Sequence, residues 1–394
     1  MAFELLTACR MLLQGLERQI LDTRVRPVVM DGGVITFSSF HSAHHALALR
    51  HLDPACATEE LATLYRLCQH ESGLIARERR VAGAADVGER SPFIAPPIAA
   101  YAVARLALEG QLGDRSLLEC AMREVDAIWG ERLPPDTSLP VILHPLESGA
   151  PHSALFGDVI ESEPGPDWEA EVAHLARSAL GCQLEPARAL RAGHPFVVED
   201  PVFCGWLLLA LEELKAAAEE RGDTAAALKL RVRSSMIRDS IEERLWWGAE
   251  EVYVAFDRAR GEALRAVTLG GLVPAASRLL LAEGNAKRAV DRHLRPGGSK
   301  LWGAQGLSLN PLRATRERAD TRAGVGVSPL AHYWAHLALS RAGRSSDARV
   351  ARAQLEGLVE THGFFGLYDA VSGVGKQSED ASLATLLLEM RCGE

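Results

Sequence analysis

Residues 144–153 read HPLESGAPHS and bring together groups that can move protons. Glu147 supplies a carboxylate, and His144 and His152 supply imidazoles, which titrate near neutral pH. The serine, glycine and proline content predicts a loop rather than a helix or a strand. These residue types at this spacing indicate general acid–base chemistry. The alternative interpretation is an ordinary loop, in which Glu147 binds backbone amides and the histidines have no chemical role.

Other candidate residues stand far from this loop in the sequence. Tyr368 and Asp369 are polar groups in a second glycine-rich loop. The ring of Trp302 can stack on a ligand in a pocket, or it can pack in the core. Asp200 precedes Pro201 and an apolar run, the position at which a carboxylate caps helical amides. Capping is the first interpretation of Asp200, and ligand binding is the second.

Two sets of histidines have a helical spacing that could hold a metal. His41, His44 and His45 are separated by three and four residues, and His332 and His336 by four. Such spacing puts side chains on one face of a helix. A zinc site needs further ligands, and no metal-binding motif accompanies either set. We interpret these histidines as structural or solvent-facing, and the sequence predicts neither a metal nor a cofactor.

The elements that must position these residues are helices almost throughout. Apolar residues recur every three and four positions, as in Leu207, Leu208, Leu211 and Leu214. The helical windows lie near residues 3–22, 41–51, 56–70, 94–110, 115–130, 168–183, 201–221, 224–246, 268–283, 285–294, 328–343, 345–361 and 379–391. Alternating strands are expected only at 28–37, around a Gly-Gly turn, and at 251–257. The pattern predicts one all-α domain over residues 1–394, a closed double ring of antiparallel helix pairs.

Composition excludes several classes of protein. The formal net charge of −9 and the scattered basic residues argue against a nucleic-acid partner. The chain has no apolar run near the roughly 20 residues that span a bilayer. Seven cysteines at irregular spacing, without a CxxC pair, are typical of reduced thiols in the cytoplasm. We therefore expect a cytoplasmic protein with a small-molecule ligand, and a homo-oligomer is possible.

Several segments, taken in order, resemble one family of enzymes. HPLESGAPHS resembles the loop H-P-W-E-S-G-x-D-N-S of helical-barrel glycosidases of the glycoside hydrolase family 63 and mannosylglycerate hydrolase type. SPFIAPPIAAYAV resembles S-Q-P-P-x-A-A-x-A-V, HPFVVEDPVF resembles F-x-V-x-D-P-x-F-N-A, and GFFGLYDAVSG resembles G-F-x-E-Y-Y-D-P-x-T-G. The similarity runs from about residue 28 to 388. It implies an (α/α)6 barrel with one or two short β-hairpins.

The departures from this pattern fall on the residues that would do the chemistry. The position of the general acid holds Pro151, and the position of the general base holds Gly366. The family's Trp-Asp pair falls on Phe37 and Ser38, and residues 324–329 lack the W-R-G-P-x-W signature. An inverting glycosidase needs two carboxylates about 6.5–9.5 Å apart. The resemblance therefore implies a barrel that has lost ordinary glycoside hydrolysis.

The expected site combines these two lines of reasoning. The catalytic candidates are Glu147, His152, His144 and Asp369, and the substrate-binding candidates are Tyr368, Trp302, Asp200, Phe37 and Arg322. We expect Glu147, His152, Tyr368 and Asp369 to share the polar wall of a central pocket that binds or processes a carbohydrate-like or other polar small molecule. Three alternatives stay open. They are an enzyme recruited as a cyclase, lyase, isomerase or transferase, a partner-binding protein with a filled pocket, and a true glycosidase with displaced carboxylates such as Asp158, Glu161 or Glu379.

Overall fold

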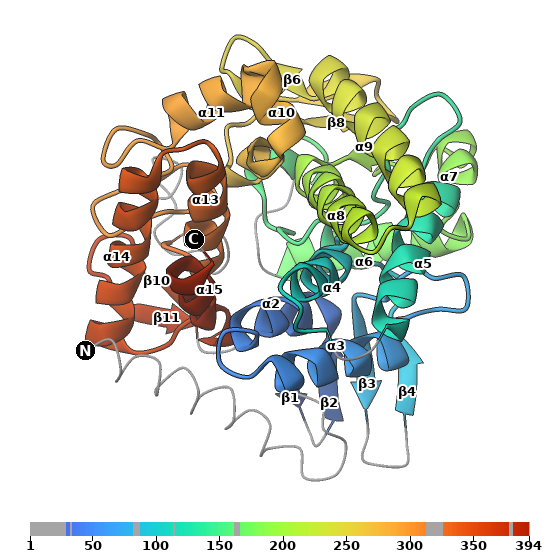
Figure 1. Ribbon diagram of the computed structural model, residues 1–394. Helices are drawn as coiled ribbons and strands as arrows, with labels where there is room; N and C mark the ends of the chain where they lie inside the picture. Colours follow the sequence, from blue (N-terminus) through green and yellow to red (C-terminus); the bar gives the residue numbers. More distant parts are fainter. Residues whose placement is uncertain are drawn as a thin grey trace.

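Paired helices form two concentric rings in the computed structural model, which describes residues 29–31, 34–81, 87–112, 115–160, 166–312, 326–377 and 381–393. Figure 1 shows the inner helices around the centre and their partners outside. The pairs are α2 (Ser39–Leu49) with α3 (Pro54–Cys68), α4 (Ile98–Leu108) with α5 (Ser116–Glu131), α8 (Pro201–Glu220) with α9 (Thr224–Arg244), and α13 (Pro329–Arg341) with α14 (Ser345–His362). Shorter helices complete the rings: α10 (Arg278–Glu283), α11 (Asn285–His293) and α15 (Leu387–Cys392). The expected single domain over residues 1–394 stays a prediction.

The sequence explains which helices lie inside. In α2 every residue except His41 is buried, and in α8 the first fourteen residues are all buried, of which all but Glu212 and Glu213 are apolar. A helix that is apolar on every side is stable only when it is surrounded by protein. By contrast, α9 buries one stripe of Ala227, Leu230, Ser234, Ile237 and Ile241, spaced three and four apart. That stripe packs on the inner ring, and the rest of α9 faces solvent.

Short strands lie in the segments that precede or connect the helices of the rings. One antiparallel sheet has the order β1 (Val29–Asp31), β2 (Val34–Ser38), β3 (Glu78–Val81) and β4 (Val87–Arg90). The others pair β5 (Val198–Glu199) with β8 (Ala255–Asp257) and β9 (Glu262–Leu264), β6 (Trp246–Trp247) with β7 (Val252–Tyr253), and β10 (Leu367–Tyr368) with β11 (Gly375–Gln377). The two strand segments expected from the sequence correspond to β1–β2 and β7–β8. Most of the others have only two to four residues, too few for alternation to be recognised.

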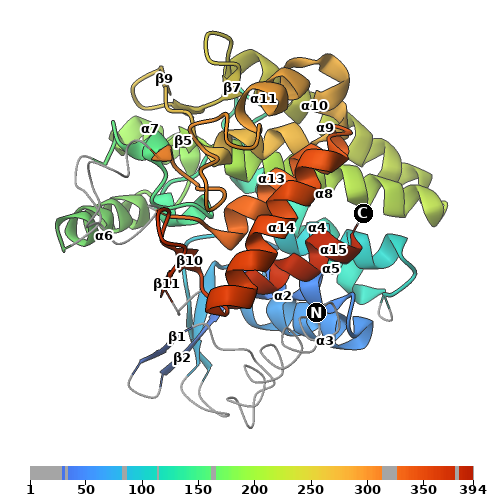
Figure 2. The ribbon, with the colours of Figure 1, turned by 90° about the vertical axis from the view of Figure 1, so that its left-hand side faces the viewer.

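The two ends of the rings differ. Figure 2 shows the strands gathered at one end, together with α6 (Pro166–Gly181) and α7 (Pro186–Ala192). The inner helices α2 and α13 begin at this end and carry their C-termini away from it. Arg50, the C-cap of α2, binds Glu389 of α15 with Nη2–Oε2 2.8 Å, and Arg341 at the end of α13 binds Glu213 with Nη2–Oε1 2.5 Å. Ion pairs therefore hold the end remote from the strands.

Candidate functional site

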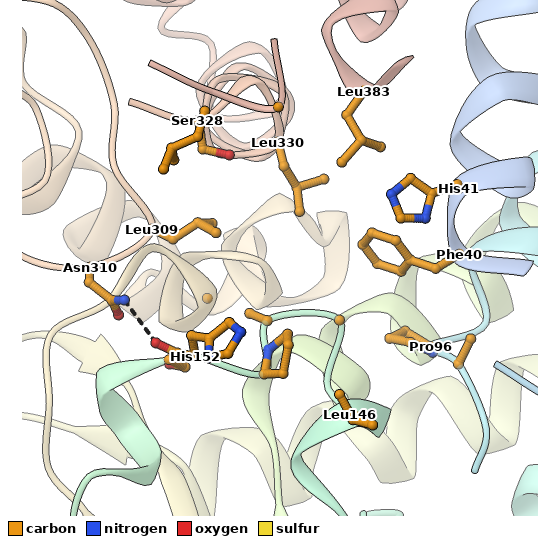
Figure 3. Close-up of a pocket in the computed structure, with 18 of the residues that line it drawn as sticks. Phe40, His41, Pro96, Leu146, His152, Leu309, Asn310, Ser328, Leu330 and Leu383 are labelled. Atoms are coloured by element: carbon orange, nitrogen blue, oxygen red, sulfur yellow. Dashed lines mark hydrogen bonds between the residues drawn. The ribbon is translucent and has the colours of Figure 1, made fainter. Parts of the chain in front are cut away.

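A cavity of about 320 Å³ lies at the strand-bearing end, where the first residues of the inner helices meet several loops. Figure 3 shows its walls. The lining residues are Phe40, His41, Arg77, Ala95, Pro96, Leu146, Gly149, Ala150, Pro151, His152, Ser153, Trp168, Gly270, Leu309, Asn310, Ser328, Leu330, Gly366, Leu367 and Leu383. We refer to this cavity as the axial pocket.

His152 is the one member of the expected polar wall that lines the axial pocket. Its ring lies against Trp168 of α6, with centroids 4.3 Å apart. Burial lowers the pKa of His152 to about 4, and the positive charge of Arg77 acts in the same direction. No hydrogen-bond partner for Nδ1 is present within the described ranges. At neutral pH the ring is therefore uncharged, with one nitrogen not used by the fold.

Asn310 fixes the loop that carries His152. Its Oδ1 accepts from the amide of Ala154 at 2.8 Å, and its Nδ2 donates to the carbonyl of His152 at 2.9 Å, as drawn in Figure 3. The two bonds join residues that are 156 and 158 positions apart in the sequence. Sequence analysis missed this residue, because an isolated asparagine in a loop has no signal. Trp168 was missed for a similar reason, since it belongs to a helical window.

Glu147 does not line the axial pocket, which corrects its expected place on the pocket wall. Its carboxylate is fully buried and bound to Arg132, with Nη2–Oε1 2.8 Å and Nη1–Oε2 3.3 Å. It also accepts from the amides of Leu143 at 2.7 Å and Ile94 at 3.1 Å. Four donors from three segments occupy its two oxygens. The side chain therefore anchors the loop and has no contact with a ligand.

His144 also belongs to the frame of the loop and not to the pocket wall. Its Nε2 donates to the carbonyl of Val172 at 3.0 Å, while its Nδ1 accepts from the amide of Leu146 at 3.3 Å. These two bonds require the neutral ring, and burial lowers its pKa to about 4. The ring stacks on Phe93, with centroids 4.1 Å apart. Both ring nitrogens are used in hydrogen bonds within the fold, and the catalytic role expected for His144 stays a prediction.

Tyr368 and Asp369 stabilise the C-terminal hairpin. The Tyr368 hydroxyl donates to the carbonyl of Gly363 at 2.8 Å, and the tyrosine is fully buried. Asp369 accepts from the amides of Val371 at 3.0 Å and Ser372 at 2.8 Å and pairs with Lys376 at 2.6 Å. The bond from Lys376 and those from the turn hold the pKa of Asp369 below its usual range. Neither side chain reaches the axial pocket, so the expected four-residue wall is wrong.

The remaining substrate-binding candidates are also structural where they are described. Trp302 is 1% exposed and donates from Nε1 to Gln354 Oε1 at 2.6 Å, so it packs in the core. Phe37 is fully buried on β2. Asp200 caps α8 by accepting from the amide of Phe203 at 3.0 Å, and burial raises its pKa to about 7. Arg322 lies outside the described residues.

The histidine sets do not form a metal site in the part of the chain that the structure describes. His44 Nδ1 donates to the carbonyl of Phe40 at 2.7 Å, and His332 Nδ1 donates to that of Ser328 at 2.8 Å. Of the displaced-carboxylate candidates, Asp158 is exposed and does not line the axial pocket. Glu161 and Glu379 lie outside the described residues. Across the described ranges, no helix has the length and apolar character needed to cross a membrane.

Pro151 and Gly366 both line the axial pocket, although they come from segments far apart in the chain. They are the positions at which the resemblance puts the general acid and the general base. The described lining contains no aspartate or glutamate. The two positions thus face one cavity, and neither has a side chain that can transfer a proton.

Comparison with known proteins identifies the family. Residues 37–380 match the family described as the mannosylglycerate hydrolase MGH1-like glycoside hydrolase domain. The chain belongs to the MGH1-like glycoside hydrolases. One relative is the mannosylglycerate hydrolase of Rubrobacter radiotolerans, which is 26% identical over 76% of this chain and 74% of its own length. Membership in this family supports a carbohydrate-related function.

Solved structures agree with the fold of an MGH1-like glycoside hydrolase. The glycoside hydrolase family 63 mannosylglycerate hydrolase from Thermus thermophilus, in complex with glucose, has a TM-score of 0.75 and 21% identity, covering 96% of this chain and 98% of its own. The same enzyme in complex with Tris and D-glycerate gives a TM-score of 0.76 and 19% identity over 97% and 98% of the two chains. At this identity the similarity shows the fold, and the predicted (α/α)6 barrel is confirmed.

Proposed function

We propose that this protein binds a carbohydrate-like small molecule in the axial pocket and does not hydrolyse glycosides with a pair of carboxylates. The observation that carries the proposal is the presence of Pro151 and Gly366 on the wall of one cavity whose described lining has no carboxylate. Hydrolysis by the inverting mechanism needs one carboxyl group to protonate the leaving group and another to activate water. With neither group in place, binding remains and bond cleavage by this route does not.

The dimensions and walls of the pocket support binding. A cavity of about 320 Å³ is within the range of roughly 300–1,000 Å³ found for small-molecule sites. Trp168 offers an aromatic surface, and His152 offers a neutral imidazole beside it. The Thermus thermophilus enzyme of the same fold holds glucose in one structure and Tris with D-glycerate in another. A polyhydroxy ligand of monosaccharide size fits these observations.

A second candidate is an enzyme recruited to a non-hydrolytic reaction. His152 favours it, because the ring is adjacent to Pro151, lines the pocket and has a nitrogen without a partner among the described residues. A neutral imidazole can remove a proton next to a carbonyl group, as an isomerase or lyase requires. Under this candidate, a His152→Gln variant would retain ligand binding and lose turnover.

Calorimetry with glucose, mannose and D-glycerate, together with chromatographic detection of mannose released from mannosylglycerate, tests the leading proposal. We expect saturable binding of at least one sugar and no release of mannose. Trp168→Ala should weaken binding. The matched variant Trp129→Ala should not, because that ring lies outside the pocket under Arg233, 4.9 Å from the guanidinium carbon. Release of mannose by the wild type would contradict the proposal and indicate displaced carboxylates such as Glu161 or Glu379.

A further inference from the structure

The walls of the axial pocket are more apolar than a sugar alone would require. Besides the aromatic rings of Phe40 and Trp168, five leucines line it, each from a different segment: Leu146, Leu309, Leu330, Leu367 and Leu383. Resting on the proposed function, we infer that the ligand is amphipathic, with a carbohydrate-like head and an apolar group such as a short alkyl chain or a single ring.

Three of the apolar lining residues belong to one hydrophobic cluster. Phe40 comes from α2, Leu330 from α13 and Leu383 from the 3-10 helix η5 (Ala381–Leu386), which contacts both of those helices. Figure 3 shows these three side chains pointing toward one another. His41 lies beside them and is held by Ser38, with Nδ1–Oγ 3.0 Å. This part of the pocket therefore offers one imidazole among apolar side chains.

The other part of the pocket is polar. His152 and Asn310 lie away from Leu383 and Phe40 in Figure 3, and Ser153 follows His152 in the same loop. A sugar hydroxyl buried against leucine side chains would lose its bonds to water without replacement, which is unfavourable. An apolar group in the same place gains from leaving water. A pocket with one apolar and one polar part thus fits a ligand that has an apolar group at one end and a polar group at the other.

Paired probes test the inference. Methyl and hexyl α-D-mannopyranoside, methyl and hexyl β-D-glucopyranoside, and 1-hexanol are titrated into the full chain by calorimetry, below the concentrations at which the hexyl glycosides aggregate. A buried methylene group strengthens binding by about fourfold. We expect at least one hexyl glycoside to bind about tenfold or more tightly than its methyl partner.

Variants assign the gain to the leucine surface. Leu383→Asn should remove most of the hexyl advantage, measured as the ratio of the affinities for the hexyl and methyl glycosides. Leu330→Asn, at a neighbouring position of the same apolar surface, provides a second test if Leu383→Asn does not fold. Leu228→Asn is the matched control, because Leu228 is 52% exposed on α9 and does not line the pocket. The control should bind every probe as the wild type does.

The outcomes separate this inference from the proposed function. Equal affinity for the methyl and hexyl members of each pair overturns the amphipathic ligand and leaves the proposed function standing. A hexyl advantage that persists in both leucine variants also overturns it. Binding of 1-hexanol with no binding of any glycoside overturns the proposed function, and with it the carbohydrate-like head inferred here. No binding of any probe counts against both.

Discussion

Buried carboxylates are distributed unevenly between the axial pocket and the frame that surrounds it. In the frame, six of the described buried carboxylates are paired with arginine: Glu147 with Arg132, Glu199 with Arg244 and Arg258, Glu212 and Glu213 with Arg341, Asp257 with Arg260, and Glu389 with Arg50. The described lining of the pocket contains none. A buried carboxylate is costly unless a cation and hydrogen bonds compensate it. The frame supplies that compensation to these six, so they have structural roles.

The contrast between pocket and frame bears on how the retained loop at residues 144–153 is interpreted. Glu147 and Pro151 stand four residues apart in one loop, yet only Pro151 lines the pocket. Loss of Glu147 would leave the buried guanidinium of Arg132 unpaired, whereas an acid facing a cavity has no such structural partner to lose. A family residue of the frame can therefore be retained for the fold alone. Its presence is no sign that the chemistry remains.

The largest effect should come from breaking an ion pair of the frame. Arg132→Met leaves the fully buried carboxylate of Glu147 unpaired, and we expect a loss of about 3–5 kcal/mol in the free energy of unfolding. Urea denaturation at pH 7 measures it. Arg188→Met is the matched control, because Arg188 is 50% exposed and pairs with Glu185, which is 48% exposed. Equal losses in the two variants would contradict a structural role for the Arg132–Glu147 pair.

Truncation of leucines should distinguish the two regions next. Leu208 is fully buried within α8, and Leu208→Ala should lower the free energy of unfolding by about 2–5 kcal/mol. Leu309 borders a cavity that already exists and is only partly buried, so Leu309→Ala should cost about 1 kcal/mol or less. Urea denaturation of both variants gives the comparison. A larger loss at Leu309 would show that the pocket wall is part of the packed core.

A pH effect should reveal the helix cap of the frame. Burial raises the pKa of Asp200 in the folded protein to about 7, above its ordinary value of 3.8. Folding therefore takes up a proton between these values. The contribution of Asp200 to stability is complete below pH 4 and is lost as the pH rises toward 7 and beyond. Asp200→Asn removes this dependence and can still accept the hydrogen bond from Phe203.

The free energy of unfolding of Asp200→Asn, relative to wild type, should increase by about 1–3 kcal/mol between pH 4.5 and pH 8. Urea denaturation at several pH values follows the change. Asp223→Asn is the matched variant, since Asp223 caps α9 at an exposed position. It should show a smaller change over the same range. A constant difference between Asp200→Asn and wild type would mean that Asp200 is ionised throughout.

The fold could be predicted from the sequence because its signals are local and repeated. The continuous apolar run of α8 indicates an inner helix, and the single apolar stripe of α9 indicates an outer helix. Both patterns can be recognised without knowledge of the neighbouring helices. Landmarks such as Pro96-Pro97 and Asp200-Pro201 then gave the order of the elements. The same local signals identified Asp200 as a cap, which the hydrogen bond to Phe203 confirms.

The pocket wall could not be predicted in the same way, because it depends on partners remote in sequence and on side-chain direction. No sequence pattern near Glu147 indicates that Arg132 is its ion-pair partner. On β10, Leu367 lines the pocket while its neighbour Tyr368 is fully buried and bound to Gly363. A shift of one residue along a strand reverses the face that a side chain occupies. The C-terminal loop was correctly placed at the pocket, but Leu367 lines the pocket in place of Tyr368 and Asp369.

The smallest effect on stability, and the sharpest contrast with the frame, is expected at His152. Because burial lowers its folded pKa to about 4, the ring should be neutral from pH 6 to 8, and ligand affinity should not change with pH through this group. His152→Gln should alter the free energy of unfolding by less than about 1 kcal/mol, since the hydrogen bond from Asn310 goes to its backbone carbonyl and survives.

An NMR titration of the His152 ring, with the His152→Gln variant used for assignment, measures the pKa directly. A midpoint near 6.5 would mean that the ring is open to water, and the pocket would then gain a positive charge within the physiological range. We expect a midpoint near 4, together with unchanged stability and altered sugar binding in His152→Gln. This result would show that His152 acts in the pocket and not in the frame. Substitutions in the frame would change folding, and substitutions in the pocket would change what is bound.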